Sequence, residues 1–216
     1  MATPKSQRIG ILVIAVVMIV GTLGSFLVLI LDTQNQQSED QALQTVYAQY
    51  QAESEAYQAK LDAQAQELSD TYYPIFKKFE SRSGPYDIDS ITELKTVDLK
   101  TGDGEKIDGD TLFAAYYIGW NPDGKVFDQS ITIDALGSPI PVDGLDQASL
   151  IEGWKTGLIG MNIGGVRELS IPSDLAYGET GQGDDIPPNT PLKFIVMAVP
   201  QPEPIEPPEI PEELLQ

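Results

Sequence analysis

The chain has 216 residues, 41% of them hydrophobic, which is enough for one ordinary domain with appended segments. It contains neither cysteine nor histidine, which excludes disulfides, thiolate nucleophiles and every catalytic triad or zinc site that requires imidazole. With 33 acidic against 13 basic residues the formal net charge is -20, which disfavours binding to nucleic acid and to anionic lipid headgroups. Carboxylates, hydroxyls and apolar pockets remain as the available chemistry.

The first predicted element is a transmembrane helix over residues 9–31, an uninterrupted run of apolar or small residues. At 1.5 Å per residue this run can cross a hydrocarbon core of roughly 30 Å. A cleaved signal peptide is the alternative, but no small-x-small cleavage site follows the run. Lys5 and Arg8 precede it and acids follow it, so residues 1–8 are expected in the cytoplasm and the domain beyond the membrane. The predicted localisation is the cell membrane, with a single span.

Residues 32–70 are predicted to form a long helical stalk, because glutamine, alanine and glutamate dominate and glycine and proline are missing. One seam of this helix has heptad spacing, through Leu43, Tyr47, Tyr50, Ser54, Tyr57, Leu61, Gln64 and Leu68. A monomeric stalk is the favoured interpretation, and a weak coiled coil that makes a homodimer is the alternative. Pro74 is expected to end the helix, and residues 71–90, with Gly84-Pro85, to form a linker.

A globular domain is predicted over residues 91–199. Apolar alternation indicates strands near residues 94–99, 111–119 and 125–128, and the sequence Asn121-Pro122-Asp123-Gly124 is typical of a tight turn between the last two. The aspartates of this region lack the spacing of a calcium loop, which favours turns.

The second half of the domain begins with a short predicted helix. Ser149 and Glu152 have the spacing of a capping box, and Ile151, Trp154 and Leu158 then fall on one helical face. Strands follow at residues 166–171 and 192–199. The last strand is apolar on both faces, which predicts a central position in the sheet.

Several short motifs occur in a fixed order through this domain. They are Ala115-Tyr116-Tyr117-Ile118-Gly119, Val126-Phe127-Asp128-Gln129-Ser130, Ile151-Glu152-Gly153-Trp154, Gly157-Leu158-Ile159-Gly160-Met161, Ile171-Pro172, Leu175-Ala176-Tyr177-Gly178 and Ile186-Pro187-Pro188-Asn189. In this order they resemble the FKBP-type peptidyl-prolyl cis-trans isomerase family. The resemblance implies an α+β fold, a curved antiparallel β-sheet wrapped around one short helix, here preceded by the transmembrane helix and the stalk. It also implies an isomerase without cofactor or metal that acts on proline-containing unfolded or nascent exported polypeptides.

The resemblance also assigns roles to individual residues. It makes Trp154 the floor of a proline pocket and places the Asp128 carboxylate beside the rotating amide. The Ile151 backbone N–H and the Tyr177 hydroxyl would each bind a substrate carbonyl. The walls and rim of the pocket would come from Tyr117, Phe127, Ile140, Leu150, Ile186 and Phe194. A non-catalytic module that binds proline-containing segments as a chaperone is the alternative function.

Three positions depart from the family pattern. Ile140-Pro141-Val142 is aliphatic where the family usually has an aromatic wall, Gln182 replaces a common histidine, and Asp185 replaces a common apolar rim residue. Together with Glu179 and Asp184, these departures predict a shallower pocket with a more acidic rim. We expect weaker binding of macrolide inhibitors and a preference for substrates with basic flanks.

Residues 200–216 alternate proline with glutamate and are predicted to be an extended, polyproline-like, disordered tail. A solvating role is the favoured interpretation. The alternatives are recognition by a partner, or by the protein's own pocket through Glu203-Pro204 or Glu206-Pro207.

Overall fold

The computed structural model describes residues 34–215, and the chain divides into two compact units. The larger unit is Gln64–Glu203, and the described part of the smaller unit is residues 34–63 together with residues 204–215. No helix between residues 34 and 215 is both long and apolar enough to cross a membrane. The predicted cytoplasmic residues 1–8 and transmembrane segment 9–31 lie outside the described residues.

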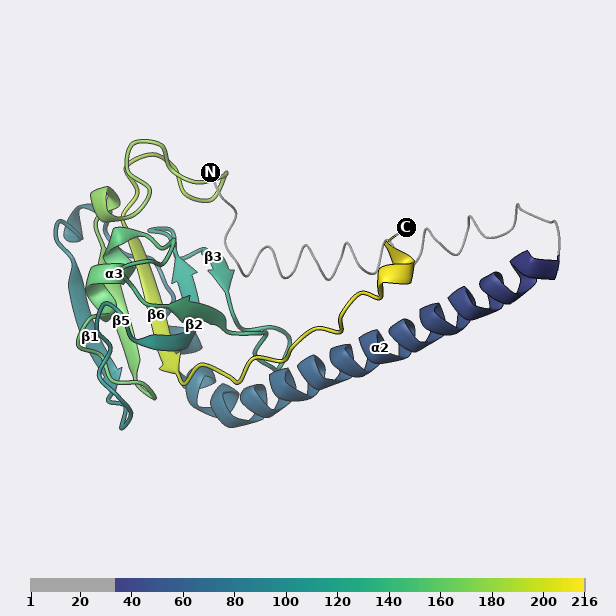
Figure 1. The fold of residues 1–216 in the computed structure, drawn as a ribbon. Helices are drawn as coiled ribbons and strands as arrows, with labels where there is room; N and C mark the ends of the chain where they lie inside the picture. The colour runs from purple at the N-terminus through teal and green to yellow at the C-terminus, as the bar shows by residue number, and fades with distance from the viewer. Residues whose placement is uncertain (1–33, 216) are drawn as a thin grey trace. The chain divides into compact units, whose positions relative to one another are not determined.

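The larger unit is built on an antiparallel sheet with the strand order β1-β5-β6-β2-β3, in which β4 also pairs with β2 (Figure 1). The strands are β1 (Lys95–Lys100), β2 (Leu112–Trp120), β3 (Val126–Gln129), β4 (Ile140–Asp143), β5 (Val166–Ile171) and β6 (Leu192–Val199). Strand β6 is buried at every position except Lys193 and pairs with β5 on one side and β2 on the other. The predicted central position of this apolar strand is therefore confirmed.

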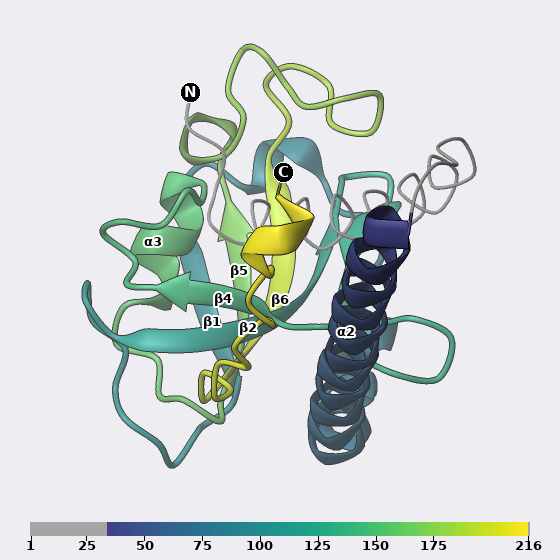
Figure 2. The same ribbon diagram turned by 45° about the vertical axis from the view of Figure 1, so that its right-hand side comes forward.

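Helix α3 (Glu152–Leu158) lies against one face of the sheet (Figure 2). A side chain on Gly153 would bring its Cβ to 2.3 Å from Ile171 Cγ2, so glycine is what lets the helix approach β5 closely. The core between helix and sheet includes Phe113, Leu158 and Leu169, each fully buried. An antiparallel sheet with one short helix on its face is the predicted fold class, and the structure confirms it.

The start of α3 differs from the prediction. The residue that caps the helix is Ile151, and no side chain caps it by a hydrogen bond, so Ser149 and Glu152 do not form a capping box. The spacing was correct for a capping box, but Ser149 lies two residues before Ile151, the residue at the N-cap position of a helix that begins only at Glu152.

The opposite face of the sheet is covered by the chain that precedes β1. Here Tyr72 and the fully buried Phe76 pack against Tyr116, with ring centroids 6.2 Å and 6.5 Å from that ring. The Trp120 Nε1–H donates to the Gly84 carbonyl at 3.1 Å. The linker predicted for residues 71–90 is thus wrong, because its aromatic side chains bury against the sheet and make it part of the larger unit.

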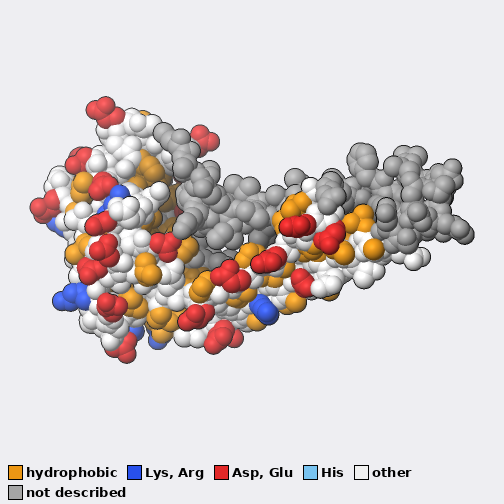
Figure 3. Space-filling model, in the orientation of Figure 1, with side chains coloured by type: hydrophobic (Ala, Val, Ile, Leu, Met, Phe, Trp, Pro, Cys, Tyr) orange, Lys and Arg blue, Asp and Glu red, His pale blue; other side chains and the backbone are white. Residues whose placement is uncertain are grey.

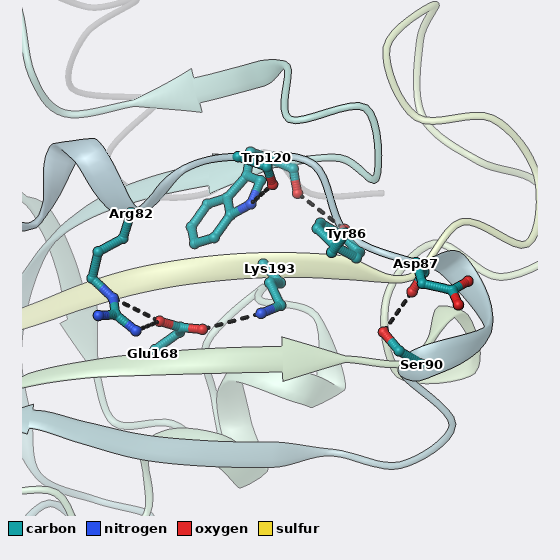
Figure 4. A network of polar contacts seen from close by, with 8 residues as sticks. Arg82, Tyr86, Asp87, Ser90, Trp120, Glu168 and Lys193 are labelled. Atoms are coloured by element: carbon teal, nitrogen blue, oxygen red, sulfur yellow. Dashed lines mark hydrogen bonds and ion pairs between the residues drawn. The ribbon is translucent and has the colours of Figure 1, made fainter.

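Polar contacts fix the same segment, as Figure 4 shows. Arg82 donates two hydrogen bonds, of 2.8 and 2.9 Å, to Glu168 on β5, and Lys193 on β6 donates to the same carboxylate at 3.2 Å. The Tyr86 hydroxyl donates to the Pro191 carbonyl at 2.8 Å. Short 3₁₀ turns shape the chain here and elsewhere, at Lys77–Arg82, Ile88–Ser90, Ser173–Leu175 and Glu212–Leu214.

Helix α2 (Gln34–Phe76) contains the described part of the predicted stalk, residues 34–70, and continues beyond it. Pro74 does not end the helix as expected, since it lies inside the last turn. A proline inside a helix removes one backbone hydrogen bond, and here the helix ends two residues later, at the fully buried Phe76. The last part of α2, from Gln64, therefore belongs to the larger unit.

Candidate active site

A cavity of about 530 Å³ opens on the face of the sheet that carries α3. Nine of the ten predicted site residues line it, namely Tyr117, Phe127, Asp128, Ile140, Leu150, Ile151, Trp154, Tyr177 and Phe194. The tenth, Ile186, is only 4% exposed and packs in the core cluster that also contains Trp154. Ile186 therefore belongs to the core and is not among the residues that line the cavity.

The aromatic rings of the cavity pack edge to face. The Trp154 ring lies 5.5 Å from Phe194 at 88° and 5.6 Å from Tyr117 at 79°, measured between centroids. Phe127 meets Phe194 at 5.6 Å and 81°. Edge-to-face packing matches the positive ring edge to the negative ring face, so these aromatics hold one another in fixed orientations. The result is a rigid apolar floor and wall.

Gly119 on β2 creates the space that two of these rings occupy. A Cβ at this position would lie 2.6 Å from Phe194 Cε1 and 2.7 Å from Phe127 Cζ. The register of β2 against β3 places Gly119 opposite Asp128, the neighbour of Phe127. The β2–β3 hairpin thus sets both the aromatic wall and the carboxylate at the edge of the cavity.

The Asp128 carboxylate is held by two donors. Tyr117 donates a short hydrogen bond from its hydroxyl to Asp128 Oδ2, and the Gln129 backbone N–H donates to Oδ1 at 2.9 Å. Burial raises the pKa of Tyr117, and the hydrogen bond to Asp128 adds to the shift. The phenol therefore keeps its proton at neutral pH, and the carboxylate stays fixed at the mouth of the cavity.

Two further donors face the cavity without a partner in the described chain. No residue between 34 and 215 accepts a hydrogen bond from the Ile151 backbone N–H or from the Tyr177 hydroxyl. Burial raises the pKa of Tyr177, and the nearby charge of Asp128 raises it further, so this hydroxyl also remains a donor. No side chain caps the N-terminus of α3, and the Ile151 N–H is left available to bind a carbonyl, the role that the family resemblance implies for it.

The loop of residues 178–187 is less acidic towards the cavity than predicted. Asp185 forms an ion pair with Lys125, and its carbonyl accepts a hydrogen bond of 3.1 Å from Asn121 Nδ2. Neither Glu179 nor Asp184 lines the cavity. The Asp185 carboxylate is therefore neutralised by Lys125, and the loop is tied to the β2–β3 turn.

Three lining residues had no predicted role in the site, namely Ser149, Glu152 and Ala176. Glu152 brings a second carboxylate to the cavity and is paired with Lys155 at 3.1 Å. Ser149 and Glu152 flank the predicted pair Leu150 and Ile151, and this proximity was the available signal. Their interpretation as helix caps concealed it.

The family model and the relatives of known name indicate the same family. A sequence model described as FKBP-type peptidyl-prolyl cis-trans isomerase matches residues 102–199. The FK506-binding protein 4 of Rhizopus delemar is 39% identical over 99 residues, which are 46% of this chain and 25% of that protein. The chain thus spans only a quarter of that relative.

Two shorter relatives are covered over most of their length. The FK506-binding protein 2 of Yarrowia lipolytica is 39% identical over 113 residues, 48% of this chain and 75% of that protein. The FK506-binding protein of Neisseria meningitidis is 36% identical over 99 residues, 46% of this chain and 87% of that protein. On this similarity, and with the predicted fold and cavity in place, the chain belongs to the FKBP-type peptidyl-prolyl cis-trans isomerase family.

Proposed function

We propose that the larger unit catalyses cis–trans rotation about X–Pro peptide bonds in unfolded or nascent polypeptides. The observation that carries the proposal is the cavity itself. It combines a buried tryptophan floor, two free hydrogen-bond donors and a carboxylate fixed by a neighbouring tyrosine. The chain's family membership supports the same activity.

The chemistry requires no bond to break. Rotation about the amide is opposed by about 18–20 kcal/mol, because the planar ground state is stabilised by resonance. Cis–trans isomerisation of an X–Pro bond without a catalyst takes tens to hundreds of seconds. A turnover time of about a millisecond therefore requires that the enzyme bind the transition state about 7 kcal/mol more strongly than the ground state. A twisted amide loses resonance and charge separation, so it enters an apolar cavity at a lower cost than the planar amide.

Each part of the site has a role in this account. The proline ring would lie on Trp154, and the Ile151 N–H and the Tyr177 hydroxyl would hold the backbone on either side of the rotating bond. A held backbone lets one half of the peptide turn against the other, which converts binding energy into orientation. Asp128, fixed by Tyr117, would hold its carboxylate beside the rotating amide.

A proline-limited refolding assay with the full-length chain tests the activity. We expect the wild type to accelerate the slow phase, and Asp128→Ala and Trp154→Phe to lose at least about tenfold of that acceleration. Asp174→Ala is the matched control, because Asp174 is exposed and lies outside the cavity. A wild type that binds a proline peptide without accelerating refolding would contradict catalysis and favour the non-catalytic chaperone module.

We also propose that the isomerase unit is anchored to the cell membrane and faces away from the cytoplasm. The apolar run of residues 9–31 and the positive charges of Lys5 and Arg8 before it support this topology. The clients would then be exported proteins.

The absence of cysteine permits a direct topology test. Ile133→Cys, at a side chain that is 94% exposed, should react in intact cells with a maleimide that cannot cross membranes. Lys5→Cys should react only after lysis. Equal protection of both positions would contradict the outward orientation.

A further inference from the structure

The C-terminal tail has a sequence period of three. Glutamate recurs at Glu203, Glu206, Glu209 and Glu212, and an apolar residue precedes each of them, at Pro202, Ile205, Pro208 and Pro211. A polyproline II helix has three residues per turn, so this repeat gives the tail one apolar face and one acidic face. A tail that only solvates the chain has no need of such a face.

Burial in the structure follows the same period. Between residues 202 and 214 the half-buried positions are Pro202, Ile205, Pro208, Pro211 and Leu214. Every residue between them is exposed, and these exposed residues include all the glutamates of the segment. The apolar face of the tail is therefore turned towards another part of the chain.

Helix α2 has a matching buried row. In the smaller unit its seam residues Leu43, Tyr47, Ser54, Tyr57 and Leu61 are half-buried, and Tyr50 is only 4% exposed. A side chain on a lone helix stays largely accessible, so a second segment must lie over this row. The heptad seam was predicted from the sequence, but the segment that covers it was not.

The tail is the described segment that runs along this helix. Figures 1 and 2 both show the chain after β6 running beside α2, in the direction opposite to the helix. Gln64 Nε2 donates to the Glu203 carbonyl at 2.8 Å, at the point where both segments pass from the larger unit into the smaller one. The repeats also match in length, because one polyproline turn rises about 9.3 Å and one heptad about 10.5 Å.

We propose that residues Pro204–Leu214 form a polyproline II strand that docks in cis along the α2 seam of the smaller unit. The docked tail occupies the surface on which a second copy of the helix would pack. The α2 seam is thus a binding site for a polyproline strand with apolar residues at every third position. This proposal does not depend on isomerase activity.

Charge opposes the docking and makes it sensitive to salt. The tail carries five glutamates from Glu203 to Glu213, and the exposed side of α2 in the smaller unit carries Glu53, Glu55 and Asp62 against Lys60. These like charges repel one another at low ionic strength and are screened when salt is added. Apolar burial holds the tail in place, and salt should strengthen its docking.

Two spin labels on the full-length chain test the proposal. The chain lacks cysteine, so Glu55→Cys and Glu206→Cys place one label on α2 and one on the tail at exposed positions. We expect one narrow distance distribution, which broadens when Ile205→Glu is added. The matched control is Ile210→Glu, which makes the same chemical change at an exposed tail position and should leave the distribution narrow.

Three results would overturn the proposal. They are a broad distribution in the parent chain, equal behaviour of Ile205→Glu and Ile210→Glu, or a dipolar signal from chains that carry the Glu55→Cys label alone. The last result would show that a second copy covers the seam. Raising the salt concentration from about 0.05 M to about 0.5 M should leave the distribution at least as narrow as before, and broadening would be a fourth result against docking by apolar contact.

Discussion

Substitution of Gly119 by alanine should damage the cavity without removing any side chain that lines it. The new Cβ would lie 2.6 Å from Phe194 Cε1 and 2.7 Å from Phe127 Cζ, whereas ordinary contacts begin near 3.4 Å. Each ring must therefore move by roughly 0.7–0.8 Å, because β2 is held by pairing with both β3 and β6. Overpacking of this kind costs about 1–3 kcal/mol of stability.

The same displacement should reduce catalysis. Phe127 and Phe194 form the wall of the cavity and meet edge to face, so a shift of either ring changes the surface offered to the twisted amide. We expect Gly119→Ala to lower kcat/KM about tenfold to a hundredfold on a tetrapeptide substrate, measured well below the unfolding midpoint.

Gly137→Ala is the control for this prediction. A Cβ at Gly137 would meet nothing closer than 3.7 Å, and its backbone is not in a left-handed conformation. It should leave kcat/KM unchanged and alter the unfolding free energy by no more than about 1 kcal/mol. If Gly119→Ala keeps kcat/KM within twofold of wild type and unfolds at the same denaturant concentration, the wall geometry does not matter as argued.

Three further outcomes are expected. Tyr117→Phe removes the hydroxyl that fixes Asp128 and should lower kcat about tenfold with little change in KM, measured on the same peptide. Arg82→Ala leaves Glu168, whose side chain is only 12% exposed, with Lys193 as its partner and should cost about 1 kcal/mol in urea unfolding. Burial raises the pKa of Tyr116 to about 12, above the value near 10 of an unfolded tyrosine, so stability should be constant below pH ~10 and fall between about 10 and 12.

Each of these outcomes has a clear opposite. An unchanged kcat in the first case would show that Asp128 does not need its tyrosine partner. If Arg82→Ala lowers the free energy of unfolding by less than about 0.3 kcal/mol, its ion pair with Glu168 contributes as little as an ordinary exposed pair. Stability that rises between pH 10 and 12 would mean that the buried phenol ionises more readily in the folded chain than in the unfolded one.

The sequence was sufficient for the parts of the fold that local patterns encode. Apolar residues on both faces predicted that Leu192–Val199 lies at the centre of the sheet. The order of the motifs carried the family resemblance, and that resemblance implied that Trp154, Asp128 and Tyr177 meet at one site. Such features depend on residue type and spacing, which a single chain displays. They need no knowledge of which segments meet.

Features that depend on distant pairing were not predicted. Tyr72 and Phe76 were predicted to be part of a linker. Their partner, Tyr116, lies on a strand far along the chain, and nothing in the local sequence indicates that pairing. Asp185 was predicted to be a free acid at the rim, but it pairs with Lys125, which lies 60 residues earlier in the sequence. The period of three in the tail was visible in the sequence, but only the burial pattern shows that it faces a partner.

The central claim is that the cavity floored by Trp154 lowers the barrier to X–Pro rotation. Exchange NMR on a proline tetrapeptide with catalytic amounts of the full-length chain measures this rotation without any coupled step. The account predicts that cis–trans exchange, which takes tens of seconds alone, becomes fast with wild type and returns towards the uncatalysed rate with Trp154→Phe and Asp128→Ala. An exchange rate that the wild type leaves unchanged, or that both variants accelerate equally well, would contradict it.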